Sequence, residues 1–266
     1  MSDVALDISI NIMASILFFI IGLIVNKAYT YFRLKRPLSK IMGSLADNRK
    51  NTVIVVPKLY SDAENLKKRP GDRTEFIQWA PHLPLLAESD AEAMMYAYNM
   101  LLKCGKKAET LYVKSDSEVT GREKEGDVLC IGAGGNALTK YVLTTINPHI
   151  TFEQEERQTI AGPVQLFGAA IIDRKTGEKW TVSNNHDFGL IIRLKNPYNQ
   201  DTNCIILAGL GTTGTVASGY YFSTHWRNIY DSLRNMKGLD GNYAVLLRVN
   251  VADPTDINLV KTSIIS

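Results

Sequence analysis

The chain has few of the residues that build metal centres and disulfide frameworks. It has 266 residues but only 3 cysteines and 4 histidines, and it contains no CxxC, HxxxH or N-x-[ST] pattern. The cysteine number is odd and the spacing is wide, so Cys104, Cys130 and Cys204 are expected to be reduced, structural thiols. We therefore expect no metal site and a body that folds in a reducing compartment.

Several common enzyme and nucleic-acid signatures are missing as well. No GxxxxGK[ST] occurs, which argues against a P-loop ATPase, and no GxSxG occurs, which argues against an α/β-hydrolase. The net charge is +3, and much of the surplus lies in Lys27–Lys40. Because the rest of the chain is near neutral, it lacks the basic stripe of a nucleic-acid binder, and no nucleic-acid partner is expected.

A long apolar run lies near the N-terminus. Ile8–Val25 carries no charge over about 18 residues, close to the roughly 20 that a helix needs to cross a bilayer. The run is preceded by acidic residues and followed by basic ones: Asp3 and Asp7 before it, then Lys27, Arg33, Lys35, Arg36 and Lys40 after it. A secretory signal has a basic start and a cleavage site, and neither is found here. The sequence predicts one uncleaved transmembrane helix.

The charge bias predicts the orientation of this helix. Lysine and arginine near a membrane helix stay on the cytoplasmic side, so we expect a single-pass protein of the inner (cytoplasmic) membrane with its N-terminus outside. The predicted organisation is a short extracytoplasmic tail (1–7), a transmembrane helix (8–26), a basic juxtamembrane linker (27–50) and a cytoplasmic α/β domain (51–266).

Strand-like and helix-like segments alternate after the linker. The strands are expected at Thr52–Val56, Thr110–Val113, Asp127–Ile131, Leu190–Leu194, Cys204–Ala208 and Tyr243–Val251, and the helices at Ser89–Cys104, Ala137–Ile146 and Thr215–Met236. Continuous apolar strands alternating with helices are typical of a parallel sheet covered on both faces. We predict a three-layer Rossmann-like or flavodoxin-like α/β fold with a mostly parallel sheet. Gly168–Asp173 and Trp180–Val182 form an expected β-hairpin insertion, Lys58–Leu86 a long loop, and Asp253–Ser266 a last strand or a tail.

Two glycine-rich turns follow predicted strands and precede helices. The candidate ligand-binding residues are Gly132, Gly134, Gly135, Asn136 and Thr139 in the first turn, and Gly209, Gly211, Thr212, Thr213, Gly214 and Thr215 in the second. Both turns are expected at the carboxyl edge of the sheet, where open α/β sheets bind ligands and where helix amides favour an anion. A nucleotide-like ligand is the expectation. The alternative is that the glycines serve tight turns and close packing alone.

These turns do not predict a bound dinucleotide cofactor. The second turn matches GxGxxG between a strand and a helix, but it comes late in the chain. The acidic residue expected about 20 positions on, at the end of the next strand, is missing too.

The densest polar run is Ser183–Asp187. His186 beside Asp187 is the candidate catalytic pair, because a carboxylate can orient a histidine that acts as a general base. The alternative is a turn before the strand at Leu190–Leu194, since asparagine and aspartate are turn residues.

The two glycine turns and their flanks also carry a resemblance. VLCIGAGGNALTKYVL, and DFGLIIRLKNPYN followed by CIILAGLGTTGTVASGYY, resemble an uncharacterised prokaryotic, membrane-anchored Rossmann-like sensor domain of bacterial conflict and signalling systems. The resemblance implies ligand sensing, with the membrane helix as the effector end and antiviral defence as one setting. It implies no catalytic residue.

Three hypotheses follow from the sequence. In the first, the protein is a membrane-anchored sensor or effector that binds a nucleotide-like molecule and acts through a homo-oligomer or a partner membrane or signalling protein. In the second, it is a nucleotide- or NAD-processing enzyme of the N-glycoside hydrolase or transferase type. In the third, it is a structural or partner-binding membrane protein whose glycine turns are only architectural.

Overall fold

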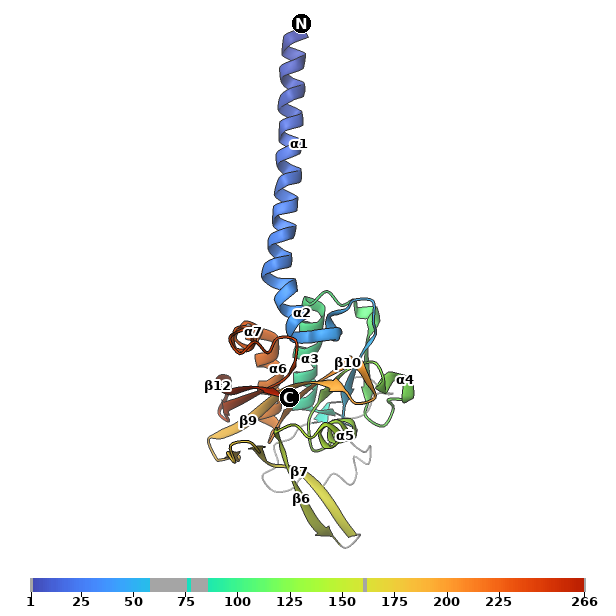
Figure 1. The fold of residues 1–266 in the computed structure, drawn as a ribbon, viewed down its shortest axis with the longest axis vertical. Helices are drawn as coiled ribbons and strands as arrows, with labels where there is room; N and C mark the ends of the chain where they lie inside the picture. The colour runs from blue at the N-terminus through green and yellow to red at the C-terminus, as the bar shows by residue number, and fades with distance from the viewer. Residues whose placement is uncertain (1, 58–75, 78–85, 160–161, 266) are drawn as a thin grey trace.

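The computed structural model describes residues 2–57, 76–77, 86–159 and 162–265. A long N-terminal helix projects from a body of strands and helices (Figure 1). Most of the predicted loop Lys58–Leu86 lies outside the described residues. Two short strands in and beside that loop, β2 (Phe76–Ile77) and β3 (Leu86–Ala87), pair antiparallel.

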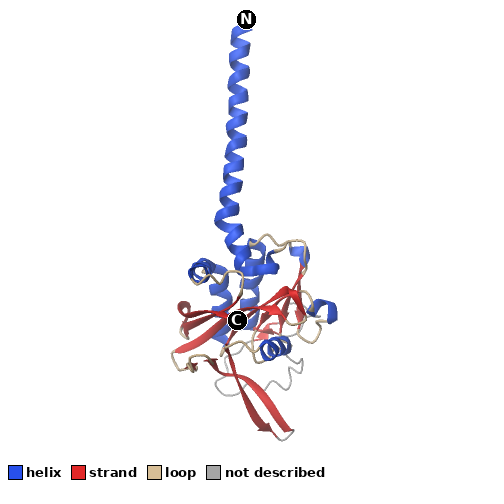
Figure 2. Cartoon of the chain, in the orientation of Figure 1, coloured by secondary structure: helices blue, strands red, loops and turns tan. Residues whose placement is uncertain are grey.

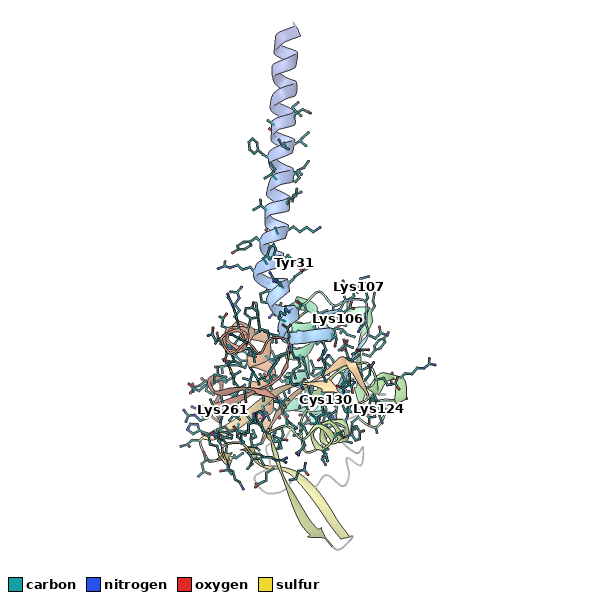
Figure 3. All side chains as sticks on the ribbon, in the orientation of Figure 1. Tyr31, Lys106, Lys107, Lys124, Cys130 and Lys261 are labelled. Carbon is teal, nitrogen blue, oxygen red and sulfur yellow. The ribbon has the colours of Figure 1, made fainter. Side chains whose placement is uncertain are left out.

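The N-terminal helix runs without a break into the body. Its parts are α1 (Ser2–Thr30), the π-helical turn η1 (Tyr31–Lys35), α2 (Arg36–Met42) and the 3-10 turn η2 (Gly43–Ala46). Its apolar window has a mean hydropathy of 2.0, and none of that window is buried in the body. Side chains of α1 extend outward, away from the rest of the chain (Figure 3). The helix is therefore long and apolar enough to span a bilayer, and it is not a core helix.

The body is built on a 7-stranded sheet. In spatial order its strands are β12 (Asp253–Ile265), β11 (Asn242–Asn250), β9 (His186–Asn196), β10 (Asn199–Gly209), β5 (Asp127–Ile131), β1 (Thr52–Val56) and β4 (Leu111–Ser115). The pairs from β10 to β4 are parallel, and the pairs from β12 to β10 are antiparallel. The prediction of an α/β fold with a mostly parallel sheet is confirmed, because β4, β1, β5, β10 and β11 all run in one direction. Asp253–Ile265 supplies an edge strand.

The predicted hairpin belongs to a separate 3-stranded sheet. β7 (Gly162–Asp173) pairs with β8 (Lys179–Trp180) on one side and with β6 (Ile150–Thr159) on the other. The sequence did not predict β6 because most of it is charged or polar and lacks an apolar run. Figure 2 shows β6 and β7 extending away from the central sheet as a long ribbon.

Helices from the two ends of the chain share one face of the central sheet. α2 packs there with α3 (Glu88–Lys103), α6 (Thr212–Thr224) and α7 (Trp226–Asn235), and their apolar residues form one core with strand residues such as Ile54 and Ile205. The other face, which carries Val53 and Val55, packs against α5 (Ala137–Ile146) and the start of the β6–β7 ribbon. The remaining helices are short: η3 (Ala108–Thr110) and α4 (Gly121–Lys124).

One predicted helix is two. The segment Thr215–Met236 breaks at His225, whose φ of −108° and ψ of 22° lie outside the helical range, and α7 begins at the next residue. The break lets Trp226 and Ile229 turn into the core beside α2. Apolar residues continue at helical spacing through the break, and no glycine or proline marks it.

The second half of the predicted linker belongs to the domain core. Leu38, Ile41, Met42 and Leu45 are fully buried, at the i, i+3, i+4, i+7 spacing of an amphipathic helix. Arg193 on β9 is 3% exposed and donates hydrogen bonds to the carbonyls of residues 40, 41, 239 and 241. The packed core therefore includes the part of the predicted linker from Leu38 to Leu45, and helical residues connect it to the projecting helix.

Candidate functional site

The structure brings the two glycine turns together. β5 and β10 are neighbouring parallel strands, so the turns that follow them leave the sheet at the same edge. The backbone nitrogen of Gly132 donates to the carbonyl of Leu207 at 2.9 Å, which holds the start of the first turn against β10. β1 flanks β5 on the other side and ends at the same edge, at Pro57. This is the edge at which open α/β sheets bind ligands.

The second turn already holds an anion, which is the side chain of Asp187. Its Oδ1 accepts hydrogen bonds from the amides of Phe188 (2.7 Å) and Gly211 (3.1 Å), and its Oδ2 accepts one from Gly214 (2.6 Å). Burial raises the pKa of the Asp187 carboxyl, and the bonds from these amides offset part of that rise. The carboxylate thus occupies the N-terminal end of α6, where the phosphate of a ligand would otherwise bind.

Close packing accounts for the glycines of the second turn. A Cβ added at Gly209 would overlap the backbone of Thr215, and one at Gly214 would overlap the carbonyl of Phe188. α6 therefore lies directly against β9 and β10, at a separation that only glycine allows. The hydroxyl of Thr215 is turned inward and donates to the carbonyl of Gly211 at 3.2 Å. The predicted binding residues of this turn that face solvent at least in part are Gly209, Gly211, Thr212 and Thr213.

The first turn is organised by Asn136. This side chain is fully buried and caps α5, since its Oδ1 accepts from the amide of Thr139 at 3.1 Å. Its Nδ2 donates to the carbonyls of Val55 (3.1 Å) and Ile131 (3.0 Å), which ties together the ends of β1 and β5. Asn136 therefore has a structural role, since it links the ends of β1 and β5 to the start of α5. Thr139 is also fully buried, so neither side chain is available to a ligand.

The open part of the first turn has an acidic rim. Gly134 and Gly135 are exposed, whereas Gly132 is buried and adopts a φ of +77°. Asp90, on the first turn of α3, faces Gly132, and burial raises its pKa from the usual 3.8 to about 6. Asp116 accepts a hydrogen bond from the amide of Ala137 at 2.7 Å, at the N-terminus of α5. Carboxylates therefore stand where an anionic ligand would need amides, and this rim suits hydroxyl or cationic groups better than phosphate.

The candidate pair His186 and Asp187 does not form a catalytic dyad. The Asp187 carboxylate is bound by the three amides described above, and neighbouring residues of a strand point to opposite faces. The Nδ1 atom of His186 is buried and has no hydrogen-bond partner among the described residues. Within the same residues no group of three histidine, cysteine or acidic side chains is placed to hold a metal.

Sequence reasoning missed the groups that define this edge. Asp90 and Asp116 follow a helix start and a strand end, which are positions that could have suggested helix capping or a ligand site. Away from this edge, Arg193 interrupts the apolar run Phe188–Leu194 of β9, and a lone arginine in such a run is a signal of a buried, hydrogen-bonded charge.

Comparison with known proteins assigns no family. No protein-family model matches the chain, and a search of curated proteins found no significant match either.

Proposed function

We propose that this protein is a single-pass membrane protein that acts as a sensor or adaptor, with its α/β domain fixed to the end of the membrane helix. The observation that carries the proposal is the unbroken helical path from α1 into the domain core through η1 and α2. A flexible tether would only localise the domain. A rigid joint transmits any change in the position of the domain to the helix.

The membrane assignment rests on the exposure and the flanks of α1. Apolar side chains such as Phe18 (72% exposed) and Phe19 (67% exposed) have no partner in the body. The basic residues of η1 and α2 follow the apolar segment, which supports a cytoplasmic domain and an N-terminus outside. Free thiols at Cys104, Cys130 and Cys204 are in keeping with a reducing compartment.

A protein with a single membrane helix signals by changing its contacts with other membrane proteins or with copies of itself. We propose that the domain changes its contacts with a second copy or with a partner membrane or signalling protein, and that the joined helix follows. A ligand can drive this only if it binds one assembly state better than the other. A role in bacterial signalling or antiviral defence rests on the resemblance described above and stays a prediction.

The proposed ligand site narrows to the first glycine turn. The parallel strands lie in the order β4-β1-β5-β10, as in a flavodoxin-like sheet, and the winding reverses between β1 and β5. Gly134 and Gly135 are exposed at this point, beside the acidic rim of Asp90 and Asp116. A nucleoside-like ligand fits this rim through its ribose hydroxyls, which donate to carboxylates. The second turn, with its anion site filled, is proposed to be architectural.

The anchor and the ligand are tested separately on the full chain. Alkaline carbonate extraction of host membranes should leave the protein in the membrane pellet, and release into the supernatant would refute the anchor. Calorimetric titration of detergent-purified protein with adenosine, AMP and NAD tests the ligand. We expect adenosine to bind at least as tightly as AMP, with weaker binding in Asp90→Asn and unchanged binding in the matched exposed variant Asp201→Asn.

The titration also separates the alternatives. Loss of NAD or nucleoside during incubation would favour the nucleotide-processing enzyme. Absence of any heat of binding would favour the hypothesis of a structural or partner-binding protein. It would not affect the proposal that α1 anchors the protein in a membrane.

A further inference from the structure

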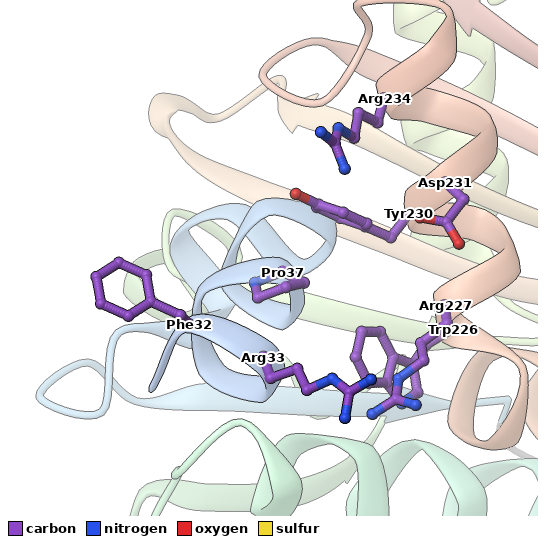
Figure 4. A pocket seen from close by; sticks show the side chains of 8 residues that line it. All are labelled: Phe32, Arg33, Pro37, Trp226, Arg227, Tyr230, Asp231 and Arg234. Carbon is purple, nitrogen blue, oxygen red and sulfur yellow. The ribbon is translucent and has the colours of Figure 1, made fainter. Parts of the chain in front are cut away.

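A cavity of about 400 Å³ lies where the juxtamembrane helix meets α7. Three arginines line it: Arg33 from η1, and Arg227 and Arg234 from α7. Trp226, Tyr230 and Phe32 are the aromatic residues of its lining, and the Phe32 ring is turned away from α7 (Figure 4). Its volume is within the range of sites that hold small molecules, roughly 300–1,000 Å³.

The charges of this cavity are not neutralised within the protein. Among the described residues no carboxylate forms an ion pair with Arg33, Arg227 or Arg234, although Asp231 also lines the cavity. Arg227 stacks over the Trp226 ring at 5.2 Å. Three cations against one carboxylate leave a positive site with planar, bidentate donors, which is the arrangement that recognises a phosphate.

The position of the cavity points to the bilayer surface. Arg33 lies eight residues beyond Val25, the end of the apolar run, which is about 12 Å along a helix. The interfacial layer adds roughly 5–8 Å on each side of the hydrocarbon core. Side chains of a helix tilt toward its N-terminus, which is here the membrane side, so an arginine at this level reaches back to the headgroups. α7 lies at the same end of the body as the root of α1 (Figure 1).

We propose that this cavity binds the phosphate of an anionic phospholipid headgroup. The inference rests on the proposed membrane anchor and extends it by naming a specific lipid contact. The arginines bind the phosphodiester, while Phe32, which is 60% exposed, contacts the rest of the headgroup region, as interfacial aromatics do. A bound lipid would join the root of the membrane helix to α7, so it would hold the domain in one orientation against the membrane.

The test is lipid titration of the full chain in detergent, with bound lipid counted by native mass spectrometry. Wild-type protein should retain dioleoyl phosphatidylglycerol in preference to dioleoyl phosphatidylcholine. Arg227→Gln and Arg234→Gln should each weaken phosphatidylglycerol binding about fivefold, because one basic residue contributes about 1 kcal/mol at an anionic surface. Asp231→Asn removes the opposing charge and should strengthen binding. Arg122→Gln, an exposed site on α4, removes the same charge elsewhere and should change nothing.

Three outcomes would overturn the inference. The first is that Arg227→Gln and Arg234→Gln, shown to be folded by circular dichroism, keep wild-type affinity for phosphatidylglycerol. The second is that inorganic phosphate displaces the lipid at equal concentration, which would make the cavity a site for a soluble anion. The third is release of the chain by carbonate, which removes both the anchor and the lipid site. If the chain stays in the membrane and only the lipid binding fails, the anchor is unaffected.

Discussion

Replacing Arg193 with methionine is expected to loosen the joint between the long N-terminal helix and the α/β domain. The guanidinium donates to the carbonyls of Lys40 and Ile41 in the last turn of α2, where a helix leaves unpaired acceptors and a partial negative charge. It also donates to the carbonyls of Leu239 and Gly241 in the loop before β11. One buried side chain therefore joins α2 to a loop about 200 residues away.

The size of the effect follows from these contacts. Four hydrogen bonds at about 1–1.5 kcal/mol each give a loss of roughly 4–6 kcal/mol. Relief of the desolvation of a buried charge returns part of this, because burial is already costly enough to lower the pKa of Arg193. Methionine keeps much of the side-chain volume, so little is added by a cavity. We expect a net loss of about 3 kcal/mol in the free energy of unfolding, a large share of the roughly 5–15 kcal/mol of a typical domain.

The assay combines stability with geometry. Urea unfolding of the full chain in detergent gives the free energy, and spin labels on Lys27 and Arg122 report the distance between helix and domain. Arg193→Met should broaden that distance distribution, while Arg193→Lys should lose less stability because it keeps the charge. Arg248→Met, an exposed arginine on β11, is the matched control. A loss below about 1 kcal/mol in the free energy of unfolding, together with an unchanged distance distribution, would refute the role of Arg193 in joining α2 to the loop before β11.

Three further predictions concern the strand edge. Since burial raises the pKa of Asp90 from 3.8 to about 6, the stability of wild-type protein should fall as the pH rises from about 4 through 6. Asp90→Asn should abolish that component and should be more stable at pH 7.5, by up to about 3 kcal/mol; parallel stability–pH curves would contradict this. Asp187→Asn leaves an amide donor facing the N–H of Gly214 or Gly211 and should cost about 1–3 kcal/mol in thermal unfolding, against no change for Asp201→Asn. Gly214→Ala must displace α6 from β9 and should cost at least about 2 kcal/mol by chemical denaturation, whereas Gly121→Ala, with nothing near its added methyl group, should cost little.

Strands with continuous β-branched or apolar runs could be predicted from the sequence. Thr52–Val56 and Asp127–Ile131 have the predicted bounds because both are buried on their two faces, and a fully buried strand leaves a clear apolar signal. Ile150–Thr159 is charged or polar along most of its length, so its strand depends on pairing with β7 rather than on its own composition. The burial of Leu38–Leu45 had a helical signal, but the basic residues around it suggested a linker instead.

The candidate site was predictable in its place but not in its chemistry. The parallel-sheet rule predicted that the turns after β5 and β10 would share an edge, and they do. Asp187 fills the second turn from 24 residues away, across a hairpin whose register sequence alone does not fix. The acidic rim depends in the same way on where α3 and the loop after β4 meet the first turn.

The π-helical turn at Tyr31–Lys35 sets the rotation of α1 about its own axis relative to the domain. The amide of Arg36 donates to the carbonyl of Tyr31, five residues back, so this turn holds one residue more than an α-helical turn. Deleting one residue here would rotate α1 by about 100° about its axis and draw it in by about 1.5 Å. Because helical residues connect α1 to the core without a break, this single extra residue sets the direction in which each face of α1, including that of Gly22, points relative to the domain. A ligand or lipid that converted this turn to α-helix would rotate α1 about its own axis without any change inside the domain.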